Sequence, residues 1–252
     1  MSDRTLILLV AAASCCFGQN AREIMEKSQR STQARSQHYE GILTVLSGSN
    51  RVAEKRWVYD RLGSHGQSKA VLRFTAPPEV KGVALLVINY PDRSSDQWMW
   101  TPAIGRERRI ALQDRATRFF GTDFSFEDLE ERDIGQFDFR LLTEEACGDS
   151  QCWKIEARPK STKSSQYTHS YVWVRKDTYG VAQIEGWKKE KLVRRIRYTN
   201  WDRVDNIWTA RRIEVDDLTR NSRTILQLEK LQYNVPQDDN DFTLQALRRQ
   251  PG

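Results

Sequence analysis

The chain has 252 residues, a length that suits one large domain better than two small ones. It carries 40 Lys and Arg residues against 34 Asp and Glu residues, and the two signs are mixed along the chain. This mixture fits a soluble surface that meets an anionic partner or lipid headgroups, and it does not require a nucleic-acid partner, which an exported protein would rarely meet.

Residues 5–19 form a short apolar run that follows Arg4 and ends in small residues. The run is shorter than the ~20 residues of a membrane-spanning helix and is typical of a signal peptide. We therefore expect cleavage of residues 1–19 and export of residues 20–252 as a single domain. Residues 12–15 also resemble a loose lipobox, so lipid attachment at Cys15 is the alternative.

The mature chain is predicted to open with one amphipathic helix and to continue as strands. In residues 21–34, Ile24, Met25 and Ser28 share a face at helical spacing. About a dozen β-rich segments follow, separated by turn residues, which is typical of an antiparallel barrel or sandwich. These segments are residues 38–46, 54–60, 68–74, 82–90, 97–101, 137–142, 152–158, 167–174, 181–187, 192–198, 207–215 and 222–229.

Cysteine use agrees with export. Removal of the leader leaves only Cys147 and Cys152, which flank a Gly-Asp-Ser turn between two extended segments. We expect a disulfide across this hairpin. Its loop is so short that it would stabilise the fold by only about 2 kcal/mol. A metal site is disfavoured because there is one pair of thiols and no second pair at zinc-ligand spacing.

No coherent catalytic set is evident. The histidines, His38, His65 and His169, lie on separate segments, so we interpret each as a surface or strand residue and not as part of a catalytic or metal-binding cluster. The stretch FFGTDFSFEDL (residues 119–129) crowds carboxylates and phenylalanines together. Its acids, Asp123, Glu127 and Asp128, could serve as a hydrolase's acid pair, but helix capping by Ser125 with Asp128 explains them at lower cost. We expect neither catalysis nor a cofactor.

Two basic runs, residues 105–109 and 188–197, could contact lipid phosphates or an acidic partner. The simpler interpretation is that both are solvated outer faces and turns of strands.

The many aromatic residues leave a question about the interior of the domain. They could line an apolar cavity or fill a dense two-layer core, and the sequence does not rank one above the other.

The segments 97–110 and 119–129 together resemble the paired signature of the outer-membrane lipoprotein-sorting family, the LolA-like carriers. Residues 78–82, the cysteine hairpin, Trp201, residues 207–209 and residues 241–244 extend the similarity over nearly all the mature chain. The resemblance implies a mainly β protein with a few helices. More specifically, it implies a half-open antiparallel β-barrel of about eleven strands, whose concave apolar face is covered by helices.

The resemblance also implies a function: a monomeric, non-catalytic periplasmic carrier that shields acyl chains on the way to the outer membrane. The cargo stays open between lipoprotein, phospholipid, hopanoid and other lipids, and an inner-membrane exporter or outer-membrane acceptor would be the partner. The alternative is an adaptor that docks on a lipid exporter without cargo. In the family an early-strand arginine holds the lid closed; Arg51, Arg56 and Arg61 are the candidates here.

On alternating strands, one set of side chains should face the acyl chain, with two phenylalanines near the lid. A single bulge would reverse the face of any strand. The predicted lipid-binding residues are Leu43, Val45, Trp57, Tyr59, Leu72, Phe74, Leu86, Ile88, Trp98, Trp100, Phe124 and Phe126.

Overall fold

A computed structural model of the protein describes residues 20–91, 93–162 and 165–249. The expected leader, its cleavage site and Cys15 lie outside these residues. None of the helices in the described ranges is long and apolar enough to cross a membrane.

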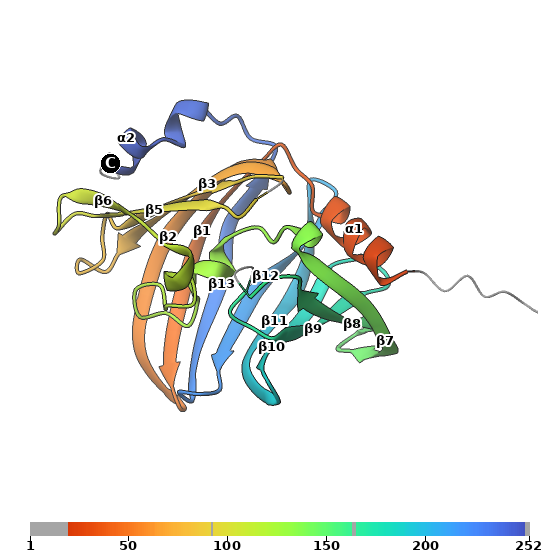
Figure 1. Ribbon diagram of the computed structural model, residues 1–252. Coiled ribbons are helices and arrows are strands. Elements are labelled where there is room, and N and C mark those ends of the chain that lie inside the picture. Colours follow the sequence, from red (N-terminus) through yellow and green to blue (C-terminus); the bar gives the residue numbers. More distant parts are fainter. Residues whose placement is uncertain (1–19, 92, 163–164, 250–252) are drawn as a thin grey trace, which may run out of the picture.

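One antiparallel sheet of thirteen strands makes up most of the described chain. Its order, β6-β5-β4-β3-β2-β1-β13-β12-β11-β10-β9-β8-β7, follows the sequence except where β1 pairs with β13. The sheet curls around a hollow, and its edge strands β6 and β7 are not paired with each other, so the barrel is half-open (Figure 1). The strands are β1 (Ser36–Ser47), β2 (Asn50–Ser64), β3 (Gln67–Ala76), β4 (Ala84–Asn89), β5 (Asp96–Thr101), β6 (Arg106–Arg109), β7 (Phe137–Cys147), β8 (Ser150–Pro159), β9 (His169–Arg175), β10 (Val181–Lys188), β11 (Lys191–Val204), β12 (Ile207–Asp217) and β13 (Ser222–Tyr233).

The fold class is therefore confirmed, with a correction to the strand count. All twelve expected strand segments form strands, and the thirteenth is β6. Its four residues contain three arginines, so they read as a basic run rather than as a strand. Its composition does not predict a strand, and the backbone hydrogen bonds that stabilise it come from antiparallel pairing with β5.

Helix α1 (Ala21–Ser31) begins at Asn20, whose side chain accepts a hydrogen bond from the backbone N–H of Arg22. Ile24 and Ser28 are buried and Met25 is half-buried, so the predicted amphipathic face is confirmed. This face packs on β7, β8 and β9. Helix α2 (Leu244–Leu247) lies at the other end of the molecule, near β5 (Figure 1).

Residues 110–136 join β6 to β7, the two edges of the sheet, and we call them the crossing segment. They contain three short 3₁₀ helices: η1 (Leu112–Asp114), η2 (Phe126–Leu129) and η3 (Ile134–Gln136). The segment passes through the hollow of the sheet (Figure 1). Four of its side chains join the main core cluster with residues of β1–β4 and β11–β13, namely Ile110, Phe119, Phe124 and Phe126. The crossing segment and α1 together cover the concave face.

The faces of β4 and β5 correct the predicted parity. Leu85 and Val87 belong to the main cluster and Met99 packs against it. The alternate residues form a separate cluster with Phe242 and Leu247 from the C-terminal segment; they are Leu86, Ile88, Trp98 and Trp100. The two sets alternate because a strand turns successive side chains to opposite faces. Strand β4 is apolar on both faces, so its sequence contained no signal for parity.

Candidate functional site under the crossing segment

A cavity of about 440 Å³ lies within the hollow of the sheet, between its concave face, α1 and the crossing segment. This volume falls in the range of small-molecule sites. The sheet supplies most of its apolar lining, which includes Trp57, Ile184, Ile196, Ile213, Leu226 and Leu228. The question of cavity or dense core is thus answered in favour of a cavity.

Tyrosines add a weakly polar strip to this wall. Tyr39 and Tyr59 stack with their ring centroids 4.8 Å apart, and Tyr233 shares a hydrogen bond of 2.6 Å with Thr209 Oγ1. Burial raises the pKa of Tyr39 and Tyr59 well above the ordinary value and raises the pKa of Tyr198 to about 12. These phenols are therefore neutral at physiological pH, and the strip carries no charge.

Aromatic rings of the crossing segment close the hollow beside the cavity. Phe119 stacks on Phe74 of β3 at 5.3 Å and meets Phe126 edge-on at 5.4 Å. Phe124 meets Trp57 of β2 edge-on at 5.9 Å. Trp57 fits there because Gly41 of β1 lies beneath it; a Cβ at residue 41 would sit 2.3 Å from the indole nitrogen. The phenylalanines thus fix the segment to the sheet.

Backbone geometry in this stretch matches its sequence. Phe120 and Gly121 both have positive φ, 44° and 70°, and form a tight bend. Ser125 caps η2, where its backbone N–H donates to Asp128 Oδ2 at 2.7 Å. The capping box is confirmed. The bend and the short helix place Phe119, Phe124 and Phe126 against the sheet.

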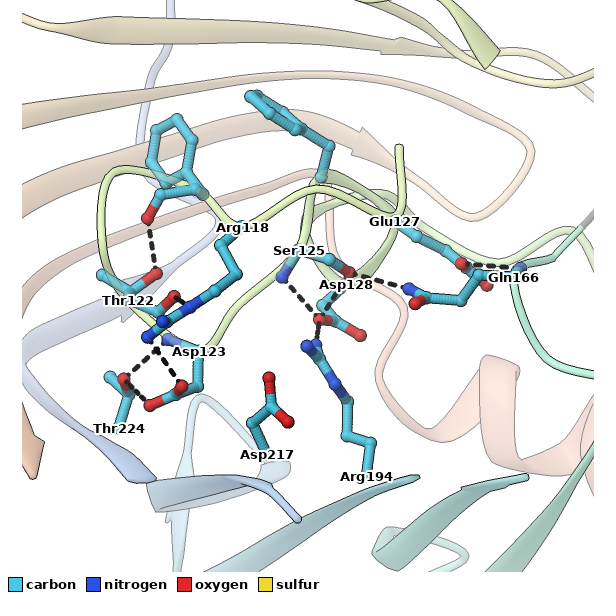
Figure 2. A network of polar contacts seen from close by, with 12 residues as sticks. Arg118, Thr122, Asp123, Ser125, Glu127, Asp128, Gln166, Arg194, Asp217 and Thr224 are labelled. Atoms are coloured by element: carbon cyan, nitrogen blue, oxygen red, sulfur yellow. Dashed lines mark hydrogen bonds and ion pairs between the residues drawn. The ribbon is translucent and has the colours of Figure 1, made fainter. Parts of the chain in front are cut away.

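Asp123 fastens the segment to β13 (Figure 2). Its carboxylate is fully buried and accepts hydrogen bonds from Arg118 at 2.8 Å, Ser222 at 2.6 Å and Thr224 at 2.8 Å. The Asp123 backbone N–H donates in turn to Thr224 Oγ1 at 2.8 Å. Every oxygen of this carboxylate is engaged, so Asp123 acts as an anchor.

Asp128 pairs with Arg194 of β11, and both side chains are less than a tenth exposed (Figure 2). The Asp128 Oδ2 atom also accepts from the Ser125 backbone and hydroxyl. Its Oδ1 atom is buried and has no hydrogen-bond partner among the described residues. Arg194 corrects the expectation for residues 188–197: β11 turns this arginine inward, although the other basic residues of the run are exposed or half-buried.

Three more acids of the segment are buried or half-buried and hydrogen-bonded, two of them to other parts of the chain and Glu130 to an arginine of the segment itself. Glu127 accepts from the Gln166 backbone at 3.0 Å (Figure 2). It also accepts from Ser165 Oγ at 2.6 Å. Glu130 accepts from Arg115 at 2.9 Å; burial raises the pKa of Glu130 although this arginine opposes the shift.

Glu131 accepts from Arg61 of β2 at 3.0 Å and from Ser68 of β3 at 2.5 Å. Arg61 is thus the candidate arginine that reaches the cover. Arg51 and Arg56 both pair instead with Glu54, near the exposed end of the β1–β2 hairpin.

The sequence analysis did not identify Arg194 or Arg115 as partners of the buried acids. The acids of residues 127–131 were a signal that buried arginines must face them, since a buried carboxylate requires a partner.

The twelve predicted lipid-binding residues fall into three groups. Trp57, Tyr59 and Phe124 line the cavity. Leu43, Leu72, Phe74 and Phe126 belong to the main core cluster, and Val45 is buried on the same face of β1 as Leu43. Leu86, Ile88, Trp98 and Trp100 lie in the cluster near α2, away from the cavity. Lining residues on β10–β13 were missed because the prediction drew only on β1–β5.

The histidines and cysteines of the described ranges make contacts within the fold. His65 borders the cavity and bonds to Thr32 Oγ1 at 2.9 Å, His38 pairs with Asp60 at 2.7 Å, and His169 lies against Trp187. No group of three His, Cys, Asp or Glu residues in the described ranges could hold a metal ion. Cys147 and Cys152 form the expected disulfide.

Comparison with known proteins places this architecture. A family model described as uncharacterized protein matches residues 66–249, more than half of the chain. A DUF1329 family protein from Desulfovibrio piger has a similar solved structure, with 24% identity and a TM-score of 0.84 over 90% of this chain and 97% of that one. No curated protein sequence matches significantly.

Two further solved structures carry informative names. A putative outer membrane lipoprotein-sorting protein domain from Vibrio parahaemolyticus is 22% identical, with a TM-score of 0.85 over 91% of this chain and 98% of that one. A LolA superfamily protein from Nitrosomonas europaea is 19% identical, with a TM-score of 0.70 over 90% and 98%. The chain therefore belongs to the family of uncharacterized proteins that the model describes, and it shares the fold of the solved outer membrane lipoprotein-sorting protein domain and of the LolA superfamily protein.

Proposed function

We propose that the protein is a non-catalytic periplasmic carrier that shields an acyl chain of a lipid or lipoprotein in transit toward the outer membrane. The observation that carries this proposal is the cavity of about 440 Å³, apolar on its sheet side and covered by α1 and the crossing segment. Each CH₂ buried there would contribute roughly 0.8 kcal/mol, which is the driving force a carrier needs.

The size of the cavity limits the cargo. A water molecule occupies about 30 Å³ in the liquid. If each heavy atom of a ligand, with its hydrogens, needs a similar volume, the cavity holds on the order of fifteen heavy atoms. One acyl chain fits this space, and several chains would require the cover to move outward. A single chain is therefore the cargo unit that we propose for the closed form.

The periplasmic location rests on two supports. The disulfide between Cys147 and Cys152 suits an oxidising compartment. A protein of the same fold carries the name outer membrane lipoprotein-sorting. The buried acids support the non-catalytic role, because Asp123, Glu127 and Asp128 bond to elements of the fold in an arrangement suited to anchoring.

Cavity filling tests the proposal. Ala210 of β12 lines the cavity, whereas Ala146 of β7 is exposed and distant from it, so Ala210→Trp and Ala146→Trp make the same change in two settings. We expect the wild type and Ala146→Trp to bind the neutral fluorophore N-phenylnaphthylamine saturably and to carry a lipid in native mass spectrometry. Ala210→Trp should lose both signals.

Circular dichroism would establish that both variants are folded. If Ala210→Trp does not fold, Ile213→Trp in the same wall replaces it as the cavity-filling variant. A wild-type protein that binds neither fluorophore nor lipid would contradict the proposal. That result would favour an adaptor that docks on an exporter without cargo. Equal binding by all variants would also contradict it, because the probe would then occupy another site.

A further inference from the structure

Arg132 differs from the arginines around it because its charge is not paired with any of the described acids. The acids Asp128, Glu130 and Glu131 of the crossing segment all line the cavity. Each has its own arginine, contributed by β11, the crossing segment and β2 in turn: Arg194, Arg115 and Arg61. These pairs neutralise one another. Arg132 lies in the same wall, and none of the described acids forms an ion pair with it.

A hydrogen bond holds the backbone of Arg132, although its guanidinium forms no ion pair with any residue in the part of the chain that the structure describes. Gln29 of α1 donates from Nε2 to the Arg132 carbonyl oxygen at 3.0 Å, so the residue sits where the two parts of the cover meet. The side chain is half-buried. Burial raises the pKa of Tyr198, and the charge of Arg132 opposes that rise, which places the guanidinium near this cavity-lining phenol.

The cavity is therefore amphipathic. Its sheet side offers Ile184, Ile196 and Ile213, whereas the crossing segment offers one guanidinium that no described acid compensates. Two other bases line the cavity: Arg61 is paired with Glu131, and His65 has a pKa lowered by burial and is neutral at physiological pH. A guanidinium presents two parallel N–H groups that match the oxygens of a carboxylate or a phosphate.

We propose that Arg132 binds the anionic head of an acylated ligand, a carboxylate or a phosphate, while the acyl chain occupies the apolar part of the cavity. This inference rests on the proposed function and adds to it the class of cargo: a single-chain anionic amphiphile. An uncharged lipid would leave the guanidinium without a counter-ion in a half-buried wall, which is unfavourable.

Competition with matched twelve-carbon ligands tests the inference. Laurate, dodecyl phosphate and dodecanol share one chain and differ in the head, and laurate has about the number of heavy atoms that the cavity holds. Each would displace N-phenylnaphthylamine from the full mature protein at pH 8, where laurate is ionised. We expect the wild type to bind at least one anion tenfold or more tightly than dodecanol.

Variants then assign the preference to Arg132. In Arg132→Gln the gap between anion and alcohol should close, while the affinity for dodecanol and for the fluorophore stays the same. Arg132→Lys should keep most of the gap because it keeps the charge. Arg108 of β6 is exposed, and the described residues offer it no ion pair, so Arg108→Gln removes a charge elsewhere and should keep the whole gap.

The outcomes separate this inference from the proposed function. A preference for laurate alone indicates a fatty acid, and a stronger preference for dodecyl phosphate indicates a single-chain lipid with a phosphate head; both support the inference. Equal affinity for anion and alcohol in the wild type, or an undiminished gap in Arg132→Gln, overturns it while the carrier function stands. If the fluorophore and all three ligands fail to bind, the carrier function and the inference fall together.

Discussion

Asp123 shows how a single carboxylate determines where the crossing segment lies. Its oxygens accept from Arg118, Ser222 and Thr224, so one side chain joins the segment's own bend to strand β13. The site is fully buried, and water cannot replace a lost bond there. A residue that resembled a catalytic acid in the sequence is thus an anchor of the cover.

Asp123→Asn should therefore destabilise the protein. The amide keeps the shape, but its NH₂ group would face hydroxyl donors and Arg118 would lose its counter-charge. We expect a loss of about 2 kcal/mol in the free energy of unfolding, measured by urea denaturation.

Glu40→Gln is the matched control, because it removes an exposed ion pair with Lys230 on the same sheet. It should change the free energy of unfolding by less than about 0.5 kcal/mol. Equal stability of both variants would mean that the polar bonds of Asp123 contribute nothing net.

At the level of elements, the crossing segment combines two kinds of contact. Phe119 and Phe126 pack in the main core cluster without reaching the cavity, whereas Phe124 belongs to the cluster and also lines the cavity. The same stretch therefore stabilises the fold and shapes the site. Phe124 and Phe126 are buried to nearly the same extent, at 5% and 4% exposure, which makes them a matched pair.

Phe124→Leu and Phe126→Leu should separate these contributions. Each variant removes similar apolar volume and should lose about 1–2 kcal/mol of unfolding free energy. Only Phe124→Leu should change the affinity for N-phenylnaphthylamine, because only Phe124 borders the bound probe. If the two variants altered binding equally, the phenylalanines would act on the cavity through the fold as a whole.

At the scale of the whole molecule, α1 and the crossing segment are held in different ways. The crossing segment is tied to β2, β11 and β13 by buried ion pairs and hydrogen bonds through Glu131, Asp128 and Asp123. Helix α1 packs mainly through apolar contacts of Ala21 and Ile24. Apolar contacts on one face of a short helix give way more readily than a buried polar network, so we expect α1 to be the part that opens for loading.

Hydrogen exchange followed by mass spectrometry tests this expectation. Without ligand, the amides of α1 should exchange faster than those of β1 and β13. Laurate at a hundred times its dissociation constant should slow exchange in α1 by up to about a hundredfold. The β7–β8 hairpin around the disulfide should be unaffected, as should α1 in Ala210→Trp. Slowing confined to the crossing segment would identify that segment as the moving part instead.

Much of this protein was determined locally and could be predicted. The amphipathic face of α1, twelve strands, the disulfide and the capping box at Ser125 all depend on residues close together in the sequence. Strand β6 was missed because pairing with β5 stabilises a run whose composition suggests a turn. The family resemblance contributed the half-open barrel, which composition and periodicity alone did not distinguish from a sandwich.

What only the tertiary structure decided is where side chains far apart in the sequence meet. The parity of β4 and β5 depends on which apolar face finds the C-terminal segment, and both faces of β4 are apolar. The inward turn of Arg194 depends on Asp128, which is sixty-six residues away in the chain. The acids beside Arg132 pair with three other arginines, and among the described residues none forms an ion pair with Arg132 itself. Such long-range charge matching has no periodic signal, since each partner is set by the register of the sheet and by the path of the crossing segment through its hollow.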